Sequence, residues 1–250
     1  MPSPWRTLAR VAVAEAKSLH SARALLAKHT AVVVRGALAS ADCARWASGV
    51  LGSKDEWTED FDGDQACLGR AFYTHLETDR TALYFADAAA SDARVERHAP
   101  GLQDRMRGLI EEAVGGRVVA RSGWCGAGVH VFPSGATVAS QGGVRHFDTE
   151  GLAEEHVTRR APAVSLVAML VPAARGGGLR IWPVLYAGRD CVDDSDLPGD
   201  GALIAYGAGD VVLFDSYSLH RIERFDGDGP RVSATLHGAE VDAGLWETWF

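Results

Sequence analysis

The spacing of apolar residues in the first part of the chain predicts helices. From Leu8 to Ala27, and again from Gly101 to Gly116, apolar side chains recur at every third or fourth residue, which is the period of an amphipathic helix. Ala31 to Leu38 is a β-branched run that predicts a strand, and Ser40 offers a cap for a further helix. Residues 52–66 are acidic and contain glycine, so we expect an exposed loop there.

After Gly116 the pattern changes to short apolar runs that predict strands. Runs such as GVHVF, AVSLVAMLV and DVVLF are separated by Gly, Pro and Asp, and many short strands of this kind are typical of a sandwich or a barrel. The sequence contains no internal repeat and no clear linker. We therefore expect an α+β protein with a single domain over residues 1–250, in which residues 1–116 form a mainly helical support and residues 117–250 form the β core.

Two connections in the second half are long and charged. They cover residues 149–161 and 188–201, and they contain the segments EEHVTRR and RDCVDDSDLPGD. Long loops in compact domains are often functional, so each connection is either solvated surface or a lid over a site.

Composition and charge exclude several classes of protein. The chain is 47% hydrophobic and 23% charged, as is usual for a globular protein, and its formal net charge of −8 argues against a nucleic-acid partner. No apolar run reaches the roughly 18 residues needed to cross a bilayer, and the N-terminus does not resemble a secretory signal. We expect a cytoplasmic protein with no membrane or nucleic-acid partner.

The segment RHFDTEG contains the first candidate chemistry. His146 and Asp148 are two residues apart, so on a strand their side chains point to the same face. This triplet alone is equally compatible with a polar turn, and a third ligand from another strand is required. His220 follows the apolar run Val211 to Phe214 and is the candidate. Two imidazoles and one carboxylate leave part of a metal's coordination sphere open, which suits Fe(II) that binds oxygen and a co-substrate.

A second polar pair lies farther along the chain, in the segment GPRVSATLHG. Arg231 and Ser233 also share one face of a strand. A guanidinium and a hydroxyl can hold a carboxylate through charge-assisted hydrogen bonds, which indicates a dicarboxylate co-substrate.

These elements in this order resemble the Fe(II)/2-oxoglutarate-dependent dioxygenases. The resemblance rests on H-x-D, a distal His after the GDVVLF strand, and R-x-S, and it covers residues 129–241. The segments VFPSGATVASQGGVRHFD and GGGLRIWP resemble more specifically the prolyl-4-hydroxylase-like branch. The resemblance implies a double-stranded β-helix, or jelly roll, braced by N-terminal helices. Residues 1–100 contribute nothing to it.

The resemblance also implies the roles of the site residues. His146, Asp148 and His220 would hold Fe(II), while Arg231 and Ser233 would bind the distal carboxylate of 2-oxoglutarate. With O2, 2-oxoglutarate would be decarboxylated to succinate and a hydrogen atom removed from the substrate, with hydroxylation, desaturation or ring closure as the outcome. Relatives that halogenate have Ala or Gly in place of the aspartate, so the carboxylate of Asp148 argues against halogenation.

Several neighbouring residues are either substrate contacts or ordinary core. His130, Trp124, Arg145 and Glu150 are the candidate substrate contacts, whereas His237 is expected to be structural or to line the pocket wall.

Three functions remain open. The first is the oxidation of a small molecule such as an amino acid or a specialised metabolite. The second is the hydroxylation of a peptide or protein side chain, and the third is a non-catalytic jelly roll that binds a metal or a ligand. The C-terminal aromatics Trp246, Trp249 and Phe250 either cover apolar surface of the domain or form the contact of a homodimer.

Overall fold

The computed structural model describes residues 6, 7 and 13–250, and its main feature is a large mixed sheet. This ten-stranded sheet has the order β2-β3-β12-β8-β15-β7-β5-β4, and β16 pairs with both β15 and β6. Its strands are β2 (Val13–Ala16), β3 (Ala31–Val34), β4 (Thr58–Asp60), β5 (Gln65–Leu68), β6 (Arg117–Ala120), β7 (Gly128–Phe132), β8 (Ala163–Val171), β12 (Val211–Asp215), β15 (Arg231–Asp242) and β16 (Leu245–Trp249).

A smaller sheet lies against one face of the large one. It has the order β1-β10-β11, with β13 also paired to β10, and a separate two-stranded ribbon joins β14 to β9. These strands are β1 (Arg6–Thr7), β9 (Arg175–Gly176), β10 (Leu179–Leu185), β11 (Ala202–Ile204), β13 (Ser218–Ile222) and β14 (Phe225–Asp226).

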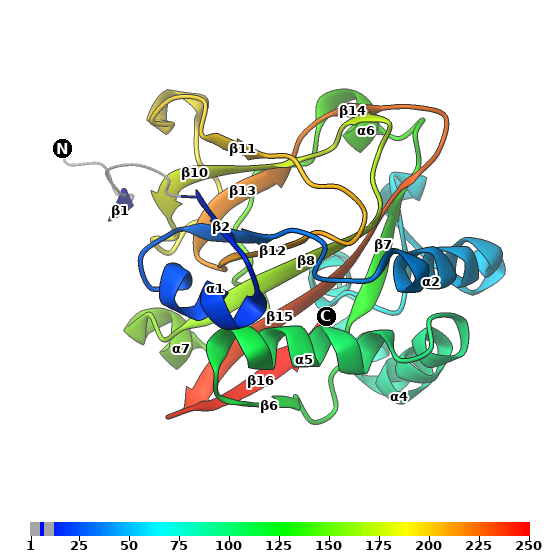
Figure 1. The fold of residues 1–250 in the computed structure, drawn as a ribbon, viewed down its shortest axis with the longest axis horizontal. Helices are drawn as coiled ribbons and strands as arrows, with labels where there is room; N and C mark the ends of the chain where they lie inside the picture. The colour runs from blue at the N-terminus through cyan, green and yellow to red at the C-terminus, as the bar shows by residue number, and fades with distance from the viewer. Residues whose placement is uncertain (1–5, 8–12) are drawn as a thin grey trace.

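The other face of the large sheet is covered by helices. Successive side chains of β3 point to opposite faces of the large sheet. Val33 packs with Ile181 of the small sheet, whereas Val32 and Val34 belong to the core on the helical side. Figure 1 shows α1 and α5 on one side of the large sheet and β10, β11 and β13 on the other. The helices are α1 (Leu19–Leu26), α2 (Ser40–Gly52), α3 (Phe72–Glu77), α4 (Thr81–His98), α5 (Leu102–Val114), α6 (Thr137–Gln141) and α7 (Glu154–Arg159).

The helix predicted at the N-terminus is shorter than its apolar period indicated. Residues 8–12 lie outside the described residues, and Val13–Ala16 is a strand parallel to β3, so the helical prediction is wrong there. Helix α1 begins after Ser18, whose side chain accepts a hydrogen bond from the backbone N–H of Ser21. Helix α2 is confirmed, but its cap residue is Ala39, without a side-chain bond, and Ser40 is already helical.

The loop predicted over residues 52–66 is partly wrong. Strands β4 and β5 form an antiparallel hairpin at the edge of the large sheet, and every residue of β5 is buried. The first half of the chain therefore contributes β2 to β5 to the same sheet as the second half, besides its helices. The prediction of α5 is confirmed, and the glycines at its two ends, Gly101 and Gly115, have φ angles of 76° and 65°.

The C-terminal aromatic residues belong to the core. They lie on and directly after β16, a strand that the sequence did not predict, and Trp249 and Phe250 are 1% and 2% exposed. Trp246 is also buried within the chain. Of the two interpretations, the covering of apolar surface is confirmed, and the dimer contact is wrong for these side chains.

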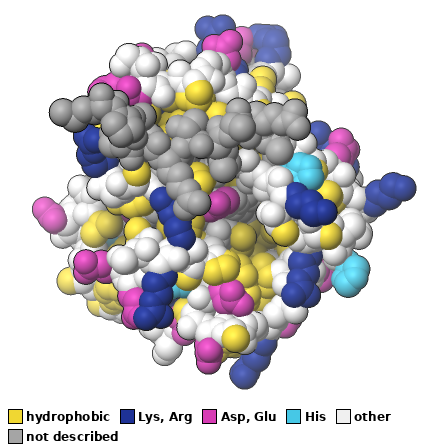
Figure 2. All heavy atoms as spheres, turned by 90° about the vertical axis from the view of Figure 1, so that its left-hand side faces the viewer, with side chains coloured by type: hydrophobic (Ala, Val, Ile, Leu, Met, Phe, Trp, Pro, Cys, Tyr) yellow, Lys and Arg dark blue, Asp and Glu magenta, His cyan; other side chains and the backbone are white. Residues whose placement is uncertain are grey.

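The charge of the surface and the character of the helices concern the expected absence of nucleic-acid and membrane partners. On the face drawn in Figure 2, Lys and Arg side chains are interspersed with Asp and Glu. Among the described residues, no helix combines the length and the apolar character needed to cross a membrane.

Candidate metal centre and co-substrate pocket

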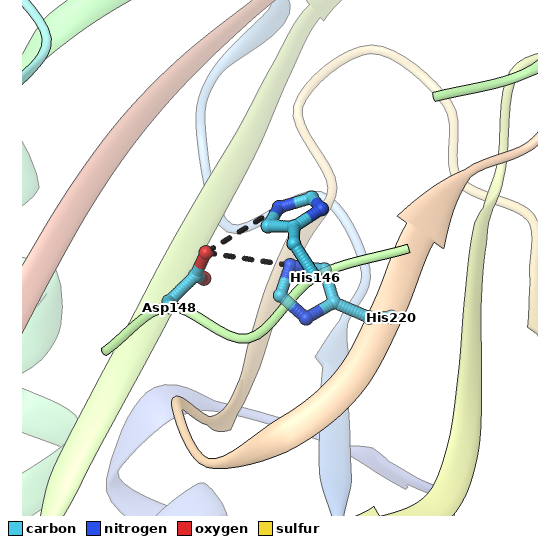
Figure 3. A group of neighbouring side chains, drawn as sticks. All are labelled: His146, Asp148 and His220. Carbon is cyan, nitrogen blue, oxygen red and sulfur yellow. Dashed lines mark ion pairs between the residues drawn. The ribbon is translucent and has the colours of Figure 1, made fainter. Parts of the chain in front are cut away.

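Backbone pairing brings the predicted metal ligands together. His146 and His220 form an isolated antiparallel bridge, in which each backbone N–H donates to the other's carbonyl at 3.0 Å. Two residues further on, the N–H of Asp148 donates to the carbonyl of Ser216 at 2.9 Å. The RHFD segment is thus held along β13 and the turn that precedes it, and Figure 3 shows the three side chains converging from these two segments.

The ligand atoms of this group face one another. The Oδ1 atom of Asp148 lies 3.5 Å from Nε2 of His146 and 3.5 Å from Nε2 of His220. One atom from each of the three residues lies within 4.8 Å of the others. This spacing allows a single ion to contact all three side chains.

The two histidines are oriented by their other ring nitrogen. Nδ1 of His146 lies 2.8 Å from the carbonyl of Val144, and Nδ1 of His220 lies 2.9 Å from the carbonyl of Ser218. A carbonyl can only accept, so Nδ1 carries a hydrogen in each ring, and Nε2 is the nitrogen that each ring directs at Asp148. Metal-binding histidines commonly have this arrangement, because the second hydrogen bond fixes the tautomer and the ring plane.

The charges in the group stabilise an ionised aspartate. Burial alone would raise the pKa of Asp148, but His220 and His237 outweigh it and hold this pKa well below its usual range. For His220, burial lowers the pKa, and the attraction of Asp148 outweighs it and raises the pKa above its ordinary value. The carboxylate is therefore negative at neutral pH, as a metal ligand must be.

Arg231 is a buried cation next to this group. It is 1% exposed, and no Asp or Glu among the described residues forms an ion pair with it. Its Nε donates to the carbonyl of Gly177 at 3.0 Å, Nη1 to Oγ of Ser233 at 3.0 Å, and Nη2 to the hydroxyl of Tyr206 at 2.6 Å. A guanidinium has five N–H groups, so two of them have no acceptor among the described residues.

One cavity joins the histidine pair to the buried arginine. Its volume is about 470 Å³, and its lining includes His146, Asp148 and His220 as well as Arg231 and Ser233. An outer cavity of about 830 Å³ lies beside it and shares His146 as a lining residue. A ligand held by Arg231 can therefore extend through the inner cavity to the histidines, and the outer cavity gives access to His146.

The four predicted substrate contacts are divided between the two cavities. His130 lines the inner cavity, where its Nδ1 lies 3.2 Å from Nε2 of Gln65. Trp124 and Arg145 line only the outer cavity, and Arg145 forms an ion pair with Asp194. Glu150 lines both cavities, and burial followed by the charge of Asp148 raises its pKa to about 7.

The structure adds Tyr206, which the sequence did not indicate, and it places His237, which was expected to be structural or to line the pocket wall, in the inner cavity. Tyr206 contacts Arg231 from a position just after β11, and Nδ1 of His237 lies 3.8 Å from Oδ2 of Asp148. Tyr206 has no regular spacing from Arg231, so the sequence carried no signal for it. His237 continues the alternation of Arg231 and Ser233 along β15, and this alternation could have placed it in the cavity.

Comparisons with known proteins give a match in structure alone. No protein-family model matches the sequence, and no curated protein matches it. Among solved structures, the epimerase SnoN in complex with Fe3+, alpha ketoglutarate and nogalamycin RO has 16% sequence identity and a TM-score of 0.53, covering 87% of this chain and 81% of that one.

Two structures from Burkholderia species are similar over nearly their whole length. An oxidoreductase of the 2OG-Fe(II) oxygenase family from Burkholderia pseudomallei has 13% identity and a TM-score of 0.53, covering 95% of this chain and 98% of that one. An N-substituted L-amino acid dioxygenase from Burkholderia ambifaria AMMD has 14% identity and a TM-score of 0.55, covering 93% of this chain and 92% of that one. The chain has the fold of solved 2-oxoglutarate- and Fe(II)-dependent oxygenases, in agreement with the resemblance of its sequence motifs.

Proposed function

We propose that the protein is an Fe(II)- and 2-oxoglutarate-dependent oxygenase that oxidises an unactivated C–H bond of a small molecule. One observation carries this proposal: a single cavity contains a His-Asp-His group at one end and a buried arginine without an acidic partner among the described residues at the other. A divalent metal and the distal carboxylate of a dicarboxylic acid supply the charges that these two ends lack.

The side chains of the first end fit Fe(II). His146, Asp148 and His220 offer two neutral imidazole nitrogens and one carboxylate oxygen, which is the donor set of mononuclear iron oxygenases with open coordination positions. The carbonyls of Val144 and Ser218 hold the two rings so that Nε2 is free to bind. We therefore assign these three residues as the iron ligands.

The side chains of the second end fit the distal carboxylate of 2-oxoglutarate. Arg231 has two N–H groups to donate, and the hydroxyls of Ser233 and Tyr206, which accept from Arg231, each have a hydrogen of their own to donate. Because this end is buried, these hydrogen bonds form with little competition from water. We assign Arg231 and Ser233 to this role and add Tyr206 to them.

In this proposal the metal and the co-substrates supply the oxidation chemistry, and the protein supplies binding and orientation. Fe(II) with 2-oxoglutarate and O2 supplies the oxidising power that removes a hydrogen atom from the substrate, with succinate and CO2 as co-products. The chain binds the distal carboxylate at Arg231 and orients the metal ligands. Buried apolar side chains such as Phe214 and Leu179 line the inner cavity and limit the access of water. The outer cavity, lined by Trp124, Arg145 and Glu150, is where we place the substrate.

The same proposal includes the finer description of the fold. We infer that the large and small sheets together form a double-stranded β-helix, with α1, α2 and α5 bracing the large sheet. Membership of the prolyl-4-hydroxylase-like branch and the hydroxylation of peptides remain predictions from the sequence motifs.

The test is the release of succinate stimulated by a substrate. The protein is incubated with Fe(II), 2-oxoglutarate and O2, and a panel of amino acids, N-substituted amino acids and peptides is screened for succinate release above the background. We expect a small molecule to stimulate release, and we expect His146→Ala and His220→Ala to abolish it. His20→Ala, at an exposed position on α1, is the matched control and should keep full activity. Full activity in either ligand variant would contradict the assignment.

A further inference from the structure

A chain of buried polar groups lies behind Asp148, and the function proposed above does not use it. It starts at His237 on β15, and it continues through Ser165 on β8 to Ser216 after β12. Ser165 and Ser216 are 0% and 1% exposed. Burying a hydroxyl without a hydrogen bond costs free energy, so the hydrogen bonds between His237, Ser165 and Ser216 fix the orientation of these side chains.

The geometry connects this chain to the carboxylate of Asp148. Oδ1 faces the Nε2 atoms of the two candidate iron ligands at 3.5 Å, whereas Oδ2 lies 3.8 Å from Nδ1 of His237. The same Nδ1 lies 3.1 Å from Oγ of Ser165, which lies 2.9 Å from Oγ of Ser216. The two oxygens of Asp148 therefore have different partners.

The backbone holds the same residues in place. Ser165 is the register partner of His237 between β8 and β15, so their side chains lie on the same face. Ser216 accepts the backbone hydrogen bond of Asp148 at 2.9 Å, and its own N–H donates to Ala163 at 3.2 Å. The segment with Asp148 and the strand with His237 are thus linked through Ser216 and Ser165.

A carboxylate needs such a partner to keep one orientation. The last torsion of an aspartate side chain is broad and roughly two-fold, so nothing within Asp148 itself determines which oxygen faces the histidines. An ionised carboxylate only accepts hydrogen bonds, so the nitrogen of His237 that faces it must be the one with hydrogen. A shift of about 1 Å turns the 3.8 Å contact into an ordinary hydrogen bond.

We propose that His237 is a positioning residue: its Nδ1–H faces both Oγ of Ser165 and Oδ2 of Asp148, is shared between these two acceptors and so keeps Oδ1 directed at the metal. This inference rests on the proposed function, because it assumes that Asp148 is an iron ligand. Partners of this kind, which hydrogen-bond a metal ligand, typically contribute a factor of about 10 to 100 in metal affinity.

The test uses a matched pair of substitutions at one position. Asn and Leu have the same branching at Cγ, but only Asn has an N–H at the position that Nδ1 occupies in His. We measure the Kd for Mn(II) by electron paramagnetic resonance, without 2-oxoglutarate and without turnover. We expect His237→Leu to bind Mn(II) about 10 to 100 times more weakly than wild type, and His237→Asn to stay close to the wild-type value.

The outcomes distinguish the two proposals. Equal Mn(II) affinity in wild type, His237→Leu and His237→Asn would overturn the positioning role alone. Equal losses in both variants would also overturn it, because they would indicate a structural role that does not depend on the N–H donor. If His237→Leu does not fold, His237→Gln replaces it, since its amide lies one bond too far from the backbone to replace Nδ1. The absence of Mn(II) and Fe(II) binding in the wild-type protein would overturn both the proposed function and this inference.

Discussion

The buried guanidinium of Arg231 gives the sharpest quantitative prediction. Replacing it with Gln keeps a side chain with a polar end but removes the charge and the two N–H groups that no described residue accepts. A hydrogen bond to a charged group contributes about 1.5 to 3 kcal/mol, so losing two of them costs at least about 3 kcal/mol. We therefore expect the Kd of 2-oxoglutarate to rise by roughly 100-fold in Arg231→Gln.

Thermal unfolding of the Mn(II)-loaded protein measures this loss. At a 2-oxoglutarate concentration of about 100 times the wild-type Kd, the wild-type protein gains about 2.7 kcal/mol of stability, which raises the Tm of a chain of this length by roughly 5 to 10 °C. At the same concentration the variant gains only about 0.4 kcal/mol, or roughly 1 to 2 °C. Pyruvate has no distal carboxylate, so it should shift the Tm of both proteins equally.

A second arginine provides the control for this experiment. Arg180→Gln removes a guanidinium that is paired with Glu223 outside the inner cavity, and it should keep the full response to 2-oxoglutarate. The same Tm shift in Arg231→Gln as in wild type would refute the carboxylate-binding role. An equal loss of response in both variants would refute it as well.

Three further predictions concern packing, charge and the pocket. A Cβ on Gly128 would lie 2.0 Å from Cε1 of Phe250, so Gly128→Ala should lower the free energy of unfolding by about 1 to 3 kcal/mol, measured by urea denaturation. Gly108→Ala is the control: a Cβ there has no atom within 4 Å, and this substitution should not lower the free energy of unfolding. Burial alone would raise the pKa of Asp87, but hydrogen bonds from Arg70 and Arg94 outweigh it and lower this pKa. The ionised Asp87 therefore stabilises the fold fully above the unfolded pKa of about 3.9, and this stabilisation is lost as the pH falls through the folded pKa. The difference in unfolding free energy between wild type and Asp87→Asn should accordingly shrink below about pH 4. A difference that stays constant with pH would contradict this prediction. Tyr206→Phe removes one neutral hydroxyl next to Arg231 and should raise the Kd of 2-oxoglutarate by roughly five-fold, about 1 kcal/mol, in calorimetric titration, and an unchanged Kd would exclude Tyr206 from the pocket.

The sequence predicted the parts of the site that depend on local spacing. Arg231 and Ser233 are two residues apart on β15, and this period alone places them on one face. His146 and Asp148 have the same spacing, but they do not lie on a strand: His146 forms an isolated bridge with His220, and Asp148 lies in a bend. The structure brings both pairs into one cavity with His220. The apolar run before His220 also predicted the strand β12 correctly.

The parts of the fold and of the site that the sequence did not predict depend on pairing between segments that are distant along the chain. Val13–Ala16 fits a helical period as well as a strand, and only its parallel pairing with β3 decides between them. Strand β5 is buried between β4 and β7, which the acidic character of its neighbours in sequence did not indicate. Tyr206 contacts Arg231 across 25 positions of the chain, and no pattern in the sequence relates the two.

The central claim is that His146, Asp148 and His220 hold one ferrous ion that also binds 2-oxoglutarate. An anaerobic titration with Fe(II) and 2-oxoglutarate, followed by visible absorption, tests it most directly. We predict a weak charge-transfer band that saturates at one equivalent of Fe(II) per chain in the wild-type protein and is lost in His220→Ala. The absence of the band in the wild-type protein, or an unchanged band in the variant, would contradict the claim.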